Sequence, residues 1–171
     1  VENKKYGYYK EFDENGKKVS VGEYLNDIPH GNWVWWQNRI KTRELTYENG
    51  LKNGPFRIYD KLGKKKIIGQ YNNDKKDGEW NWFSDQKGLD SLIVYNNNQY
   101  NGEYNIWHAN GNQAVKGDYN NGLKNGEWKW FNKKGQKDSI KIYDTGQLFG
   151  FVTIYYNGRQ PREIMHYVNN K

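Results

Sequence analysis

The chain has 171 residues, a formal net charge of +7 and no cysteine, so disulfides, thiolate metal sites and a cysteine nucleophile are excluded. Hydrophobic residues make up 35% of the chain and aromatic residues 17%, which indicates that burial depends on Trp, Tyr and Phe. No apolar run approaches the roughly 20 residues of a membrane-spanning helix. The chain begins at Val1 rather than Met, which predicts removal of upstream residues and leaves the compartment open between cytoplasmic and exported.

Glycine recurs along the chain at an almost constant spacing. The intervals are 24, 23, 24, 24, 24 and 24 residues, for Gly7, Gly31, Gly54, Gly78, Gly102, Gly126 and Gly150. Self-similarity at such a period is typical of repeat arrays, in which each repeat packs on its neighbours. We therefore expect residues 1–171 to form a single repeat-array domain whose repeats begin near these seven glycines.

Each repeat contains two β-prone runs and two turn signals. The first signal is Asn-Gly or a looser X-Gly pair, at Asn15-Gly16, Leu62-Gly63, Lys87-Gly88, Asn110-Gly111, Lys134-Gly135 and Asn157-Gly158. The second is a tyrosine followed three residues later by Gly, Asn or Asp, at Tyr24, Tyr47, Tyr71, Tyr95, Tyr119 and Tyr143. These residue types accept positive φ, so the chain is expected to reverse at both signals. The predicted fold class is all-β, an elongated antiparallel meander of seven stacked β-hairpin repeats without helices.

Two repeats depart from this pattern, and the fourth does so because its Lys87-Gly88 pair comes one place late. The second repeat has Gln37-Asn38-Arg39-Ile40 in place of the hairpin glycine, with one residue deleted. We expect this turn to differ locally from the others.

The pairing register across the tyrosine turns predicts a packing rule for one face of the sheet. If these turns close symmetrically, Tyr24 lies opposite Gly31 and the pairing continues outward two residues at a time. Tryptophan then faces glycine in the pairs Gly22 with Trp33, Gly69 with Trp80 and Gly117 with Trp128. Side chains of intermediate size face each other in the pairs Leu45 with Phe56, Ile93 with Tyr104 and Lys141 with Val152. We interpret the glycine and tryptophan pairs as structural, because an indole fills the space that a strand glycine leaves.

Both faces of the expected sheet carry aromatic side chains. An antiparallel sheet with one side in water does not need two apolar faces, so either one side closes on itself or one side is kept for a partner. The candidate partner-binding residues are Trp35, Trp82, Trp130, Trp36, Trp107 and Tyr59. Packing over glycine also accounts for the tryptophan pairs, and partial exposure would allow both roles.

The order Gly-x-aromatic, Asn-Gly and Tyr-x-x-Gly-x-x-x-Gly, as in the segment from Tyr119 to Trp128, resembles MORN repeats. It is most similar to the bacterial MORN-repeat variant, some members of which are labelled antitoxins of toxin-antitoxin systems. The resemblance covers nearly the whole chain. It implies stacked β-hairpins that act as an interaction module, with suggested uses in protein binding, self-association and contact with anionic lipids.

No catalytic residue, metal site or cofactor is expected. The histidines His30, His108 and His166 fall at different places in the repeat, and an imidazole needs a positioned partner to act as a base or a ligand. The carboxylates Glu79, Glu103 and Glu127 recur directly after the repeat glycine, which indicates a structural or solubilising place rather than a glycosidase pair. The sequence does not contain the Gly-x-x-x-x-Gly-Lys-Ser/Thr motif of a phosphate-binding loop.

Three classes of function follow from the sequence. The leading hypothesis is a non-enzymatic scaffold that binds a protein partner through an extended aromatic face, antitoxin-like, immunity-like or envelope-associated. The second is binding of a glycan, whose sugar rings could stack on the row of aromatic side chains, or of an anionic lipid, because a charge of +7 attracts anions. Lysines also keep the edges of a β-protein soluble. The third is an enzyme, which needs a pocket with convergent ionisable side chains. Neither nucleic acid binding nor a membrane span is expected, and the oligomeric state is open.

Overall fold

The computed structural model describes residues 4–85 and 88–168, and within these ranges it contains fourteen β-strands and no helix. The strands are β1 (Gly7–Phe12), β2 (Lys18–Leu25), β3 (Ile28–Gln37), β4 (Ile40–Glu48), β5 (Leu51–Tyr59), β6 (Lys65–Asn72), β7 (Lys75–Ser84), β8 (Gly88–Asn96), β9 (Gln99–Trp107), β10 (Gln113–Asn120), β11 (Leu123–Phe131), β12 (Lys137–Asp144), β13 (Gln147–Tyr156) and β14 (Gln160–Tyr167). Hydrogen-bonded neighbours follow the order of the chain. The predicted all-β antiparallel meander of seven hairpins is confirmed.

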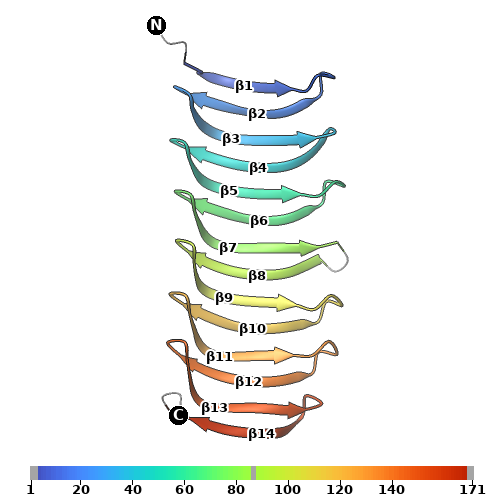
Figure 1. Ribbon diagram of the computed structural model, residues 1–171, viewed down its shortest axis with the longest axis vertical. Helices are drawn as coiled ribbons and strands as arrows, with labels where there is room; N and C mark the ends of the chain where they lie inside the picture. The colour runs from blue at the N-terminus through green and yellow to red at the C-terminus, as the bar shows by residue number, and fades with distance from the viewer. Residues whose placement is uncertain (1–3, 86–87, 169–171) are drawn as a thin grey trace. The chain divides into compact units, whose positions relative to one another are not determined.

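The chain divides into two compact units, residues 1–78 and 79–171, and the boundary falls within β7. The first unit contains β1 to β6, and the second contains β8 to β14. Within each unit, consecutive strands lie side by side, and the turns that join them alternate between the two ends of the strands (Figure 1). A single domain over the whole chain stays a prediction.

The tyrosine turns are two-residue turns, and both of their central residues have positive φ. At the first turn φ is 54° for Asn26 and 67° for Asp27. The same place is taken by Asn49-Gly50, Asn73-Asp74, Asn97-Asn98, Asn121-Gly122 and Thr145-Gly146, all with positive φ. Positive φ at both positions defines the type I′ turn, whose twist matches that of the flanking strands. The predicted turn positions are confirmed, and the Asn, Asp and Gly found there are the residue types that this backbone favours.

At the other end of the strands, longer hairpin turns are stabilised by a side chain that accepts hydrogen bonds from backbone N–H groups of the turn. Oδ1 of Asp13 accepts hydrogen bonds from the backbone N–H groups of Asn15 and Lys17, at 3.0 and 2.8 Å. Asp60 and Asn132 accept from the corresponding positions of their own turns. In the second repeat the deleted residue leaves a two-residue turn, with φ of 50° at Asn38 and 67° at Arg39, so the expected local difference is confirmed. In the Lys87-Gly88 turn, Lys87 lies outside the described residues.

The repeat glycine lies at a bulge after each tyrosine turn, so it is opposite the turn tyrosine of the following strand, as in Gly31 with Tyr47, and not opposite the preceding one. Tyr24 pairs with Pro29, and the register moves by two residues between Val21 and Glu23. The predicted pairing of Tyr24 with Gly31 is therefore wrong, because the tight turn sets one register and the extra residues form a bulge. All seven repeat glycines have positive φ, from 65° at Gly31 to 111° at Gly102, which explains why the bulge needs glycine. Beyond the bulge the predicted register holds.

Burial on the tryptophan face follows the predicted packing rule. Trp33, Trp80 and Trp128 are only 5%, 2% and 1% exposed. A Cβ atom on Gly22 would lie 2.1 Å from Cδ2 of Trp33, and one on Gly117 would lie 2.3 Å from Cδ2 of Trp128, so each indole covers its glycine as predicted. The pairing of Leu45 with Phe56, Ile93 with Tyr104 and Lys141 with Val152 is also confirmed. Gly69 and Trp80 belong to different units, and their pairing stays a prediction.

Candidate functional site

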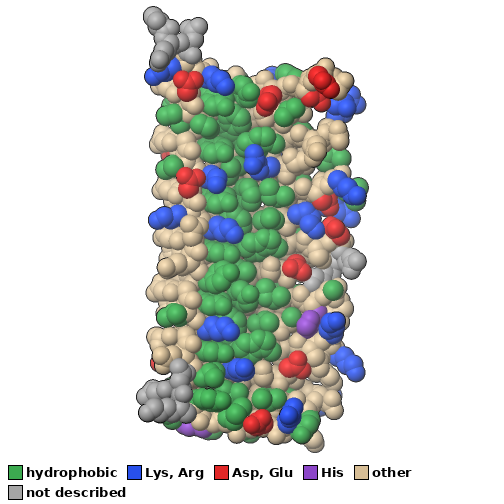
Figure 2. Space-filling view, viewed as in Figure 1, with side chains coloured by type: hydrophobic (Ala, Val, Ile, Leu, Met, Phe, Trp, Pro, Cys, Tyr) green, Lys and Arg blue, Asp and Glu red, His purple; other side chains and the backbone are tan. Residues whose placement is uncertain are grey.

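Each unit has an aromatic face, which we define as the face of its sheet that carries the buried tryptophans. Side chains alternate between the two faces of a strand, so the residues paired with these tryptophans share their face. Figure 2 shows a central band of hydrophobic side chains in each unit, with Lys and Arg side chains set among them. Acidic side chains in this view lie mostly outside the band. The chemistry available on this face is therefore aromatic and cationic.

In the first unit, five rings form what we call the first ring cluster, which consists of Tyr9, Tyr24, Trp33, Trp35 and Tyr47. The ring of Trp33 is stacked on Trp35, with centroids 5.7 Å apart and an interplanar angle of 28°. Tyr24 and Tyr47 meet Trp33 edge-on, at 5.0 and 6.3 Å. Nε1 of Trp33 donates to the carbonyl of Glu23 at 3.2 Å, so the buried indole is also hydrogen-bonded. Edge-on and offset pairs of this kind add to the stabilisation from burial.

In the second unit, the second ring cluster repeats this arrangement with Tyr104, Tyr119, Trp128, Trp130 and Tyr143. Trp128 and Trp130 are 5.8 Å apart at 31°, and Tyr119 and Tyr143 meet Trp128 edge-on at 5.0 and 6.3 Å. Nε1 of Trp128 donates to the carbonyl of Asp118 at 3.0 Å. Burial raises the pKa values of Tyr104, Tyr119 and Tyr143 above the ordinary tyrosine value.

Cationic side chains lie over the outer surfaces of these rings. In the first ring cluster the guanidinium carbon of Arg43 is 3.8 Å from the centroid of Trp35. In the second, Nζ of Lys124 is 4.6 Å from the centroid of Trp128 and 5.1 Å from that of Tyr143. A cation over an aromatic face is attracted by the ring quadrupole. These cationic groups cover part of the ring surface. Each of them could also bind an anion in place of the ring.

Few carboxylates lie near the aromatic face of the inner strands, within the part of the chain that the structure describes. The paired positions of this face in β2 to β6 and in β8 to β13 hold no Asp or Glu, whereas Asp138 lies at the bulge of β12, where side chains do not alternate. On β1 the carboxylate of Glu11 accepts a hydrogen bond from the hydroxyl of the buried Ser20, at 2.7 Å. That pair lines a hollow of about 280 Å³ beside the first ring cluster.

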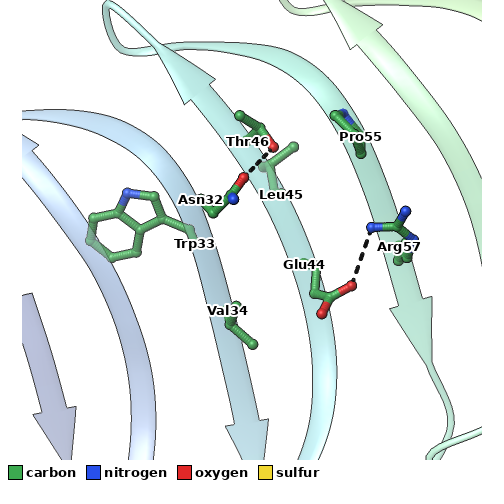
Figure 3. A pocket seen from close by; sticks show the side chains of 8 residues that line it. All are labelled: Asn32, Trp33, Val34, Glu44, Leu45, Thr46, Pro55 and Arg57. Atoms are coloured by element: carbon green, nitrogen blue, oxygen red, sulfur yellow. Dashed lines mark hydrogen bonds and ion pairs between the residues drawn. The ribbon is translucent and has the colours of Figure 1, made fainter.

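The opposite face of the first unit holds a hollow of about 330 Å³, shown in Figure 3. Glu44 lies at its side, accepting a hydrogen bond from the hydroxyl of Tyr59 at 2.6 Å and paired with Arg57 at 3.4 Å and with Lys41. Burial alone would raise the pKa of Glu44, but the hydrogen bonds and the two cations lower it below its ordinary value. Burial and the bond to Glu44 raise the pKa of Tyr59 to about 12. The carboxylate is thus held ionised by its own neighbours.

The six candidate partner-binding residues are divided between the two faces. Trp35, Trp82 and Trp130 lie half-buried on the aromatic face, each next to a fully buried tryptophan, at centroid distances of 5.7, 5.9 and 5.8 Å. Trp36, Tyr59 and Trp107 lie on the opposite face, where Lys18 covers Trp36 and Lys41 covers Tyr59. The binding role of all six stays a prediction.

The sequence reasoning placed Lys141 on the aromatic face but missed the other lysines there, although a signal exists. A lysine follows the turn tyrosine by five residues in three repeats, at Lys52, Lys76 and Lys124. Lys52 pairs with Tyr47 and Lys124 pairs with Tyr119, because the type I′ turn brings these positions opposite each other. The register assumed from the sequence paired the turn tyrosine with the repeat glycine, so the pairing of tyrosine with lysine was not seen.

The three histidines have different surroundings. Nε2 of His108 lies 2.7 Å from the carbonyl of Phe131, and the ring of His166 is 4.8 Å from that of Phe151. Nδ1 of His30 is buried without a hydrogen-bond partner. Among residues 4–85 and 88–168, no group of three or more His, Asp or Glu is placed to hold a metal ion. The same residues include no helix of the length and apolar character that a membrane span requires.

Comparison with known proteins gives no guide to a specific activity. No protein-family model and no curated protein matches the chain. A crystal structure of the GtfA/B complex bound to UDP and GlcNAc is similar over 72% of this chain, at 12% sequence identity and a TM-score of 0.28. The chain spans 24% of the length of that protein. A similarity this weak carries no argument about function.

Proposed function

We propose that the aromatic face is a protein-binding surface and that the chain is a non-enzymatic interaction scaffold, a MORN-repeat protein of the bacterial variant. The observation that carries the proposal is the pairing of a buried with a half-buried tryptophan. Trp33 and Trp128 fill the core, whereas Trp35 and Trp130 keep exposed ring surface beside them. Tryptophan, tyrosine and arginine are the residues that dominate binding energy at protein interfaces, and all three types occur together here.

Charge supports the same face over the opposite one. On the aromatic face Lys124 and Lys141 form no ion pair among the described residues, whereas on the opposite face Glu44 and Glu127 neutralise neighbouring cations. A face with charge left over has electrostatic attraction to offer a partner, and a face whose charges are paired internally has less. An antitoxin-like, immunity-like or envelope-associated partner remains part of this proposal.

The experiment compares two sets of variants that differ in face. The aromatic-face variant carries Trp35→Ser, Trp82→Ser and Trp130→Ser, and its control carries Trp36→Ser and Trp107→Ser on the opposite face. A protein captured by the wild-type chain is identified, purified and titrated against both variants. We expect the aromatic-face variant to bind at least about thirtyfold more weakly, as for the loss of a hot-spot residue worth 2 kcal/mol, and the control to bind within about threefold of wild type.

Folding is checked by far-UV circular dichroism and the melting temperature of each variant. Loss of binding by the opposite-face control with retention by the aromatic-face variant would contradict the proposal. So would retention of the chain on polysaccharide or on acidic liposomes without a protein partner, which would favour glycan or lipid binding instead.

A further inference from the structure

Two lysines converge above one indole in the second unit. Nζ of Lys124 and Nζ of Lys141 each lie 5.2 Å from the ring centroid of Trp130. Lys124 comes from β11 and Lys141 from β12, on the same face. Two ammonium groups near one ring repel each other, and the shared ring offsets only part of that repulsion. An anion bound close to both ammonium groups would relieve this repulsion.

Neither Lys124 nor Lys141 forms an ion pair with a carboxylate among the described residues. Asp138 lies at the bulge of β12 beside Ser139, which pairs with Trp130, but it forms no such pair with either lysine. On the opposite face of the same strand β11, Lys129 has its own counter-ion, because its Nζ lies 2.6 Å from Oε1 of Glu127. The same strand thus carries a neutralised lysine on one face and an uncompensated pair with a neighbouring strand on the other.

The pKa of Lys124 agrees with this geometry. Burial lowers it below the ordinary lysine value, and the positive charge of Lys141 lowers it further. A bound anion would favour the charged form and reverse part of this shift.

The surroundings of the two lysines narrow the chemistry of the occupant. Lys141 pairs with Val152, which is 3% exposed, and the turn tyrosine Tyr143 pairs with Leu148. An isolated pair of cations framed by apolar and aromatic side chains suits an anion that is itself flanked by apolar groups. Acidic side chains interspersed with apolar ones in a polypeptide have this character, whereas a nucleic acid backbone places a phosphate at every nucleotide and requires a longer row of cations.

We infer that Lys124 and Lys141, above Trp130, form a carboxylate-binding site for an acidic segment of a polypeptide partner. This inference rests on the proposed function of the aromatic face and specifies the chemistry of its partner. An Asp or Glu side chain accepts hydrogen bonds from both ammonium groups, and the apolar neighbours of that side chain pack on Trp130 and Tyr143.

The test uses a copolymer of glutamate and tyrosine, poly(Glu,Tyr), as the probe for the full chain. We expect the wild-type chain to bind it at low salt and the Lys124→Gln/Lys141→Gln variant to bind at least about tenfold more weakly. Lys129→Gln removes one positive charge from the opposite face of the same strand and is expected to stay within about twofold of wild type. Equal binding by all three chains, or no binding by the wild type at low salt, would overturn the inference.

The source of the carboxylate is tested in parallel. Tighter binding to phosphatidylserine vesicles or to heparin than to poly(Glu,Tyr) would also overturn the inference. If a captured protein needs the aromatic-face tryptophans but binds the Lys124→Gln/Lys141→Gln variant as it binds wild type, the proposed function stands and this inference fails. If poly(Glu,Tyr) needs the two lysines but no protein partner needs the tryptophans, the carboxylate site stands and the proposed function fails.

Discussion

The first and second ring clusters have the same rings in nearly the same geometry, and they differ in what surrounds those rings. Each has a glycine under the buried tryptophan and a tyrosine edge-on to it at 5.0 Å. The half-buried tryptophan has different cross-strand neighbours in the two clusters. Ser20 and then Glu11 follow Trp35 across the strands in the first, and Val115 and then Ile106 follow Trp130 in the second. The buried tryptophan faces Leu45 in the first and Lys141 in the second.

The turn tyrosines show the same difference. Tyr24 pairs with Pro29 in the first cluster, whereas Tyr119 pairs with Lys124 in the second. The positions that build the core are thus repeated, while the positions around them change from a carboxylate and a hydroxyl to apolar side chains and two lysines. The repeat therefore keeps the rings of the core, and the neighbouring positions give the two clusters different surface chemistry.

Replacing the buried tryptophan should have the largest effect and should be equal in the two clusters. Trp33→Ala and Trp128→Ala each remove an almost fully buried indole and its hydrogen bond to a carbonyl. Loss of a buried aromatic side chain costs about 3 to 5 kcal/mol, so we expect this loss of unfolding free energy in both variants by urea denaturation followed with far-UV circular dichroism. Trp35→Ala, next to Trp33 but half-buried, is the control and should cost less. A difference of more than about 2 kcal/mol between Trp33→Ala and Trp128→Ala would break the comparison.

Adding one methyl group under the indole should have the next largest effect. Gly22→Ala and Gly117→Ala place a Cβ 2.1 and 2.3 Å from the tryptophan ring, and neither glycine has positive φ, so the strain is steric. Overpacking of this kind costs about 1 to 3 kcal/mol, measured by the same denaturation experiment.

Gly122→Asn is the matched control for the glycine substitutions. Gly122 has open space around its Cβ position, and an asparagine with similar φ occupies the same turn position at Asn98. We expect this variant to lose less than about 1 kcal/mol. An equal loss in Gly22→Ala and Gly122→Asn would show that the backbone, rather than the covering indole, determines the cost.

The sequence predicted the fold well because its signals are local and repeated. Turn residues with positive φ, such as Asn26 and Asp27, and the pairing of Gly22 with Trp33 could be read from spacing alone. The register at the tyrosine turns could not, because a bulge at Gly31 adds residues that alternation does not reveal. That error moved Lys124 away from Tyr119, so its place on the aromatic face was not recognised. The binding role of the tryptophans depends on a partner, and spacing holds no information about it.

Raising the pH should have the smallest effect on the unfolding free energy, and it separates the contribution of Lys124 from that of the buried tyrosines. Burial raises the pKa values of Tyr47 in the first cluster and of Tyr104, Tyr119 and Tyr143 in the second. Above pH 10 the folded chain therefore binds more protons at these tyrosines than the unfolded chain, and the unfolding free energy should fall as pH rises. Lys124 acts in the opposite direction, since its lowered pKa makes stability rise with pH in the window up to 10.5. Lys124→Gln should remove this rise, giving a steeper fall than in wild type when urea denaturation is repeated between pH 8 and pH 11. A flat profile above pH 10 in both chains would show that the tyrosines ionise equally in the folded and unfolded states, and would contradict their burial in the ring clusters.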